Sequence, residues 1–243
     1  MDIPDLSIDW STLFSRADPV ALSPALTLGI LAIAAALSIP RATWQVFGLF
    51  TTLVHELGHA TAAILTGRVV HGIRIRRNHS GEAVSSGRGG FGSVVSGMFG
   101  YPAPAIVGAV QLWSVFNGYT AAALFGGGVV LVLTILVIRN LFGVLVVLAS
   151  AAVSIALWVF ATPQVQSYAL LVLGIVLLVG AVRGLGTVIA VHVRRRGQLR
   201  TSDAYLLYLR TRVPSFVWLV AFAAVIGGCV VIAVGSYAAY VAS

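Results

Sequence analysis

Seven apolar stretches, each close to the length of a membrane-crossing helix, constrain the fold of this chain more than any other feature. A transmembrane helix needs about 20 consecutive, mostly apolar residues. Only 9% of the residues are charged, whereas a soluble domain has roughly a quarter. We therefore predict an all-α polytopic membrane protein with about six to seven transmembrane helices, forming one domain over residues 1–243. The stretches cover residues 22–39, 42–66, 91–117, 119–138, 141–161, 165–191 and 214–241.

The polar segments between these stretches indicate a small non-helical element and an orientation. Residues 67–90 alternate apolar and polar side chains in VVHGIRIRR and again in EAVSS, which predicts a short membrane-associated β-hairpin. Arginine is the only cationic residue type apart from histidine, and it gathers in residues 67–90 and in a connector over residues 192–213. The positive-inside rule places both segments in the cytoplasm, with the N-terminus inside and the C-terminus outside. Topology thus explains the arginines, and we expect no nucleic-acid partner.

One apolar stretch contains the sequence HELGH, residues 55–59. On a helix, His55 and His59 lie on one face about a turn apart and can bind the same metal ion. Glu56 stands beside them, where it can reach a water molecule on the metal, as in zinc metalloproteases. Ionisable groups are expensive inside a membrane, and two packed histidines with a buried glutamate would leave that cost uncompensated. We therefore predict one catalytic Zn²⁺, with Glu56 as general base.

A catalytic zinc site needs a third protein ligand. After residue 18 the chain has three carboxylates: Glu56, Glu82 and Asp203. Glu82 belongs to the tip of the predicted hairpin, as do His71 and His79 to the same loop, and these residues are the alternatives. Asp203 precedes an apolar helical run in the 192–213 connector, on the same side of the membrane as the inner end of the HELGH helix. A carboxylate is also common at a helix N-terminus for structural reasons, and the two roles are compatible. We predict Asp203 as the third ligand.

These residues together resemble the site-2 proteases, the intramembrane zinc metalloproteases, and among them the small bacterial branch without an inserted periplasmic domain. HELGHA at 55–60 matches the family's HExxH helix, and GRVVHGIRI at 67–75 is similar to the hairpin that follows it. GYPAPAIVG at 100–108 is similar to a GY-x-GP element, with Ala103 where that element has glycine. SDAYLLYLRTRVPSFVW at 202–218 resembles the late aspartate motif, reading SDA in place of LDG. The core of the predicted domain is then residues 42–217.

The resemblance implies regulated intramembrane proteolysis: cleavage of a transmembrane segment of another membrane protein, in a bacterial plasma membrane. The expected partners are that substrate and the lipid bilayer, and the active site is expected nearer the cytoplasmic side. The substrate must unwind locally, because a helix hides its amide bonds. The hairpin could then add a strand to it. The substrate's identity and the oligomeric state do not follow from the sequence.

Two other functions compete with this interpretation. A metal-binding membrane scaffold or chaperone would hold the ion without turnover, but it has no need of Glu56. A transporter would use histidine and aspartate as an ion path, and it predicts paired broken helices in two halves, which the sequence does not show. Two smaller questions stay open. The GYPAP segment, residues 100–104, is either a kink or a break that holds substrate, and Asn140 supports a turn or bonds to the site.

Overall fold

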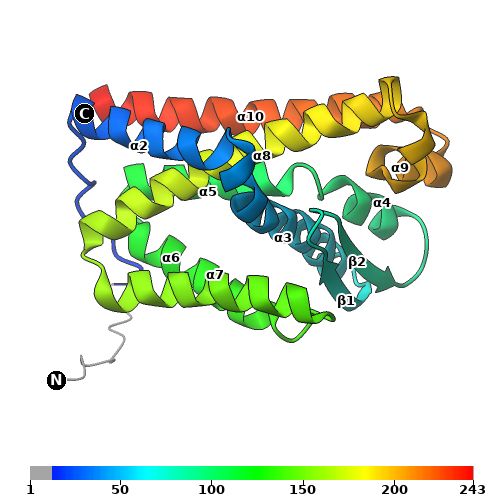
Figure 1. Cartoon of the computed structure of the whole chain (residues 1–243), viewed down its shortest axis with the longest axis horizontal. Coiled ribbons are helices and arrows are strands. Elements are labelled where there is room, and N and C mark those ends of the chain that lie inside the picture. Colours follow the sequence, from blue (N-terminus) through cyan, green and yellow to red (C-terminus); the bar gives the residue numbers. More distant parts are fainter. Residues whose placement is uncertain (1–12, 243) are drawn as a thin grey trace.

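The computed structural model of the chain describes residues 13–242, which form a helical bundle with one small sheet (Figure 1). Local sequence signals start several helices. Ser23 accepts a hydrogen bond from the backbone N–H of Leu26 and caps the helix that begins at Pro24. Thr162 caps the helix that begins at Pro163 in the same way, and in both helices the proline occupies the first turn. The helices are α2 (Pro24–Ser38), α3 (Arg41–Leu65), α4 (Phe91–Met98), α5 (Ala103–Phe116), α6 (Thr120–Thr134), α7 (Leu141–Phe160), α8 (Pro163–Val193), the 3-10 helix η1 (Arg196–Thr201), α9 (Asp203–Thr211) and α10 (Ser215–Ala242).

The described residues contain three helices that are long and apolar enough to cross a membrane singly, namely α7, α8 and α10. Two bent pairs, α2 with α3 and α4 with α5, raise the number to five if each pair is one span. Helix α6 is apolar but has only 15 residues. Large apolar side chains stay exposed on the outward helices, such as Phe160 at 81% and Val231 at 71%. Such a surface suits lipid rather than water, and the chain is a membrane protein.

The first two predicted spans are joined in the structure as one bent pair. Helix α2 has 15 residues, about 22 Å at 1.5 Å per residue, and α3 continues from it at an angle of 90°. Between them lie only Ile39 and Pro40, too few to reverse the chain. Arg183 of α8 stabilises the bend, because its Nη1 donates to the carbonyls of Ser38 (2.6 Å) and Ile39 (3.1 Å), which no following turn can bond.

Both described ends of the chain lie at one end of the bundle, opposite the sheet (Figure 1). The backbone N–H of Ala17 donates to the carbonyl of Gly118 at 3.0 Å, and that of Leu22 donates to the hydroxyl of Tyr240 at 2.9 Å. The orientation expected from the sequence, with the N-terminus inside and the C-terminus outside, stays a prediction, because both termini lie outside the described residues.

Strands β1 (Val69–Ile75) and β2 (Gly81–Ser86) pair antiparallel directly after the HELGH helix, which confirms the predicted hairpin. The segment between α6 and α7 covers the outer edge of β1. The N–H of Ile73 donates to the carbonyl of Val137, and the N–H of Arg139 donates to that of Ile73, both at 2.8 Å. The Asn140 side chain continues this edge by accepting from the N–H of Ile75 (3.0 Å) and donating to its carbonyl (2.7 Å). Asn140 thus secures the edge of β1. The outer edge of β2 is not paired with another strand among the described residues.

Small residues bring the central helices close together. Helix α5 packs against α8 and α10, and a Cβ at Gly108 would lie only 2.6 Å from the carbonyl oxygen of Gly174. Glycine at both positions lets the two backbones touch, as at many helix interfaces in membranes. Helix α3 crosses near this centre and carries the HELGH residues toward the sheet (Figure 1).

Candidate metal centre

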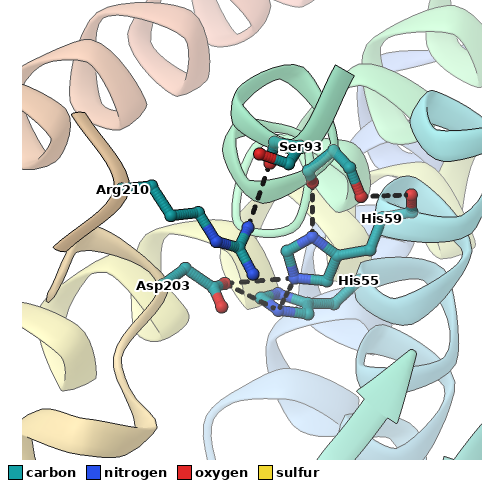
Figure 2. Close-up of polar contacts among 6 residues, drawn as sticks. His55, His59, Ser93, Asp203 and Arg210 are labelled. Atoms are coloured by element: carbon teal, nitrogen blue, oxygen red, sulfur yellow. Dashed lines mark hydrogen bonds and ion pairs between the residues drawn. The ribbon is translucent and has the colours of Figure 1, made fainter. Parts of the chain in front are cut away.

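The HELGH residues lie in the middle of α3, and the regular helix places His55 and His59 on the same face. Their Nε2 atoms are 3.2 Å apart, and the two rings meet edge to face. Helix α9 begins with Asp203, and this end of the helix lies against the histidine face of α3. The carboxylate points at both rings, with Oδ2 at 3.3 Å from Nε2 of His55 and 3.2 Å from Nε2 of His59 (Figure 2).

These three donor atoms have the spacing that a tetrahedral zinc ion requires. Zinc binds histidine nitrogen and carboxylate oxygen at about 2.0–2.1 Å, so neighbouring donors of a tetrahedron lie about 3.3 Å apart. The observed separations of 3.2, 3.2 and 3.3 Å match that edge. The residues His55, His59 and Asp203 could therefore hold a metal ion, and each is partly buried. Burial opposes ionisation of Asp203, but the charges and hydrogen bonds of the two histidines keep the pKa of its carboxyl below the ordinary value.

Helix α4 orients the second histidine. The Nδ1 of His59 lies 2.6 Å from the carbonyl oxygen of Ser96, and a carbonyl can only accept, so Nδ1 carries the proton. This tautomer leaves the lone pair of Nε2 free for a metal, as the outer partners of histidine ligands generally do. The Ser96 hydroxyl donates back to the carbonyl of His59 at 2.9 Å, which ties α4 to α3.

The same short helix also holds α9. Nη1 of Arg210 donates to the carbonyl of Ser93 at 3.1 Å (Figure 2). Helix α4 therefore links the two helices that carry the three donor residues. The roles of Ser96 and Arg210 were missed in the sequence, because carbonyl groups and a surface arginine have no motif that marks them.

Gly100 lies directly against the two histidines in the turn that joins α4 to α5. A Cβ at this position would lie 2.5 Å from Cε1 of His59 and 2.8 Å from Nε2 of His55. The next residue, Tyr101, packs its ring edge to face on His55, with centroids 4.7 Å apart. The GYPAP segment is thus a break between two helices and also a wall of the site. Ala103 packs against Gly58, another position where a side chain would collide.

Glu56 is buried beneath the sheet with 5% of its surface exposed. A Cβ at Gly81, the first residue of β2, would lie 2.5 Å from Cγ and 2.6 Å from Cδ of Glu56. The hairpin tip is held down by the Thr52 hydroxyl, which donates to the carbonyl of His79 at 3.3 Å. The start of β2 therefore covers the carboxylate that stands beside the donor group.

The alternative ligands from the sequence lie elsewhere. Glu82 forms an exposed ion pair with Arg76 at 3.2 Å. The three remaining histidines each have another contact: His71 bonds to Ser86 at 2.6 Å, His79 stacks on Trp44, and His192 bonds to Ser202 at 2.9 Å. Among residues 13–242, the group that could hold a metal therefore consists of the HELGH histidines and the aspartate of α9.

Comparison with protein families identifies the family of this chain. The family model described as Peptidase M50B-like matches residues 28–233, most of the chain. The chain belongs to this family. Membership supports the resemblance to the site-2 proteases, and an M50B-like peptidase is a membrane metalloprotease. Searches of curated proteins and of solved structures give no match.

Proposed function

We propose that the chain is an intramembrane zinc endopeptidase that cleaves transmembrane segments of other membrane proteins. The observation that carries this proposal is the triangle of donor atoms from His55, His59 and Asp203, with edges of 3.2–3.3 Å, placed beside the buried Glu56. We place it in the plasma membrane of a bacterium, with the site nearer the cytoplasm, because the sheet and the arginine-rich connector lie at the same end of the bundle.

Each residue of the site then has a chemical role. His55, His59 and Asp203 would hold the zinc ion. The bound ion supplies Lewis acidity, which lowers the pKa of water toward neutrality. Glu56 takes a proton from the attacking water and passes it to the leaving amide nitrogen. The carbonyl of Ser96 keeps the proton on Nδ1 of His59, so Nε2 of this ring would be able to bind the ion.

The free edge of β2 is the place where we propose that an unwound substrate binds. In an antiparallel pair, opposite residues alternate between bonding to each other and pointing their backbone groups away. Ile73 and Ile75 point theirs toward the segment after α6, so their partners Ala83 and Gly81 point theirs to the opposite edge. No residue between 13 and 242 bonds to the backbone groups of Gly81 or Ala83 at that edge. A peptide paired there would run alongside Gly81, the residue that lies against Glu56.

Substitution of the general base tests the catalytic proposal. The Glu56→Gln protein should bind about one zinc per chain, as wild type should, but should not cleave. The assay co-expresses each enzyme variant with single-span membrane proteins and measures how much of the single-span protein stays intact. The intact protein should accumulate with Glu56→Gln and disappear with wild type. Glu82→Gln is the matched control, because it removes a carboxylate of the exposed pair with Arg76. Wild-type protein without zinc, or a Glu56→Gln variant with wild-type cleavage, would refute the proposal.

A proline in β2 tests the strand-addition step separately. Ala83→Pro removes an N–H that points away from β1, so the hairpin keeps its ladder but the edge loses a donor. We expect lower cleavage at unchanged zinc content, whereas Ala83→Ser, which keeps the N–H, should behave as wild type. Equal cleavage by all three proteins would show that substrate does not pair with this edge.

A further inference from the structure

A hollow that the catalytic proposal does not use opens at the sheet end of the molecule, among α8, η1, α9 and α10. Its volume is about 330 Å³. It is separate from the donor group and mostly apolar, with two tyrosines and a histidine in its wall. The lining residues are His192, Leu199, Tyr205, Tyr208, Pro214 and Ser215.

Arginines without a counter-charge flank this hollow in the chain. Arg200 follows the lining residue Leu199, and Arg212 comes two residues before Pro214. Arg194 and Arg195 lie at the end of α8, and the side chains of all four arginines are exposed. Among residues 13–242, no carboxylate lies within 4.0 Å of any of them. Asp203, the carboxylate of α9, contacts His55 and His59 instead, so no ion pair among the described residues neutralises this charge.

The backbone at Arg212 points to a use for its side chain. Arg212 directly follows α9 as its C-cap residue and has the left-handed conformation, with φ of 64°. Glycine is the usual residue at such a helix end, because a Cβ makes the conformation strained by about 1 kcal/mol. The positive-inside rule accounts for arginines in the 192–213 connector in general. It does not account for an arginine at position 212 in particular, where glycine would be less strained. Strain of this kind is characteristic of binding sites.

We propose that this hollow binds the head group of an anionic phospholipid. The guanidinium groups of Arg200 and Arg212 would bind the phosphate, for which their planar donors are well matched. Tyr205 and Tyr208 would lie at the level of the glycerol, as tyrosines do at membrane interfaces, and Leu199 would contact the acyl chains. Basic pockets between membrane helices on the cytoplasmic side are suited to such lipids. This proposal does not depend on the catalytic one.

Lipid in the hollow would also stabilise the site. Tyr205 and Tyr208 belong to α9, the helix that begins with Asp203, and their rings lie 5.9 Å apart. A ligand that binds the folded protein alone stabilises it by mass action. An occupied hollow would therefore hold α9 against α8 and α10.

Thermal unfolding of the full chain in a neutral detergent tests the binding. Titration with phosphatidylglycerol should raise the Tm of wild type by several degrees in a saturable way, whereas phosphatidylcholine should not. Inorganic phosphate at matched concentrations should not reproduce the shift. If inorganic phosphate gives the same shift, the ligand is a free anion and the lipid proposal is overturned.

Matched variants separate a specific site from general positive charge. The double variant Arg200→Gln with Arg212→Gln should need at least tenfold more phosphatidylglycerol for half of the shift. Arg88→Gln, which changes an exposed arginine between β2 and α4, should respond as wild type. Arg212→Gly should unfold at the same or a higher temperature than wild type without lipid, because the strain is relieved, yet should respond more weakly to phosphatidylglycerol. An unchanged response in the double variant, or an equal loss in Arg88→Gln, would overturn the proposal.

Discussion

Gly81→Ala should displace Glu56, the proposed general base, and leave metal binding unchanged. The added Cβ would lie 2.5 Å from Cγ and 2.6 Å from Cδ of Glu56. Ordinary contacts between carbon atoms are about 3.5–4.0 Å, so the two groups must separate by about 1 Å. Both backbones are held, one within α3 and one in the sheet, where Gly81 lies opposite Ile75. The Glu56 carboxylate is therefore the part that moves.

A displacement of 1 Å in a catalytic group can reduce a rate by about 100-fold. We expect Gly81→Ala to cleave a model substrate at about one hundredth of the wild-type rate, while zinc per chain stays at the wild-type value. Gly89→Ala is the matched control, because a Cβ at Gly89 meets nothing within 4 Å. A Gly81→Ala protein with the wild-type rate would show that β2 does not confine Glu56. A loss of zinc in proportion to the loss of activity would show that the strand supports the metal site instead.

Four further substitutions test other parts of the structure. Gly100→Ala should lose zinc, because its Cβ would lie 2.8 Å from a histidine Nε2, and metal analysis of the purified protein measures this. Asp203→Ala should weaken zinc binding by more than about 100-fold in a chelator competition, since loss of an outer partner alone costs 10–100-fold. Asn140→Leu removes two hydrogen bonds to the edge of β1 and should lower the free energy of unfolding by about 2 kcal/mol, measured by denaturant titration. Burial lowers the pKa of His79, whose ring stacks on Trp44, so the folded protein binds a proton there less readily than the unfolded chain does. The contribution of His79 to the free energy of unfolding should therefore be full above about pH 6.5 and should fall at lower pH. Melting temperatures from pH 5 to 8 measure that trend, and His79→Gln should remove it.

The grouping of the three possible metal ligands was readable from the sequence because so few residues could take part. Helical spacing placed His55 and His59 together, and the scarcity of carboxylates pointed to Asp203, which the structure places with them. The 90° bend at Pro40 was not readable, because two apolar runs look alike whether they form one crossing or two. The contact between Gly81 and Glu56 was also hidden. It depends on how the hairpin folds back over α3, which no local pattern encodes.

The edge of β2 is short, and its length bears on how quickly the products leave. The carbonyl of Ser85 already accepts a hydrogen bond from the Arg68 side chain at 3.3 Å. The outward-pointing backbone groups of β2 that remain for a substrate are therefore those of Gly81 and Ala83. Two residues offer about four backbone hydrogen bonds, each worth about 1 kcal/mol net. A free energy of about 4 kcal/mol corresponds to a dissociation constant near 1 mM. If substrate pairs with this edge as we propose, backbone pairing of this extent would align an unwound segment for the reaction and would still let the cut ends return to the lipid.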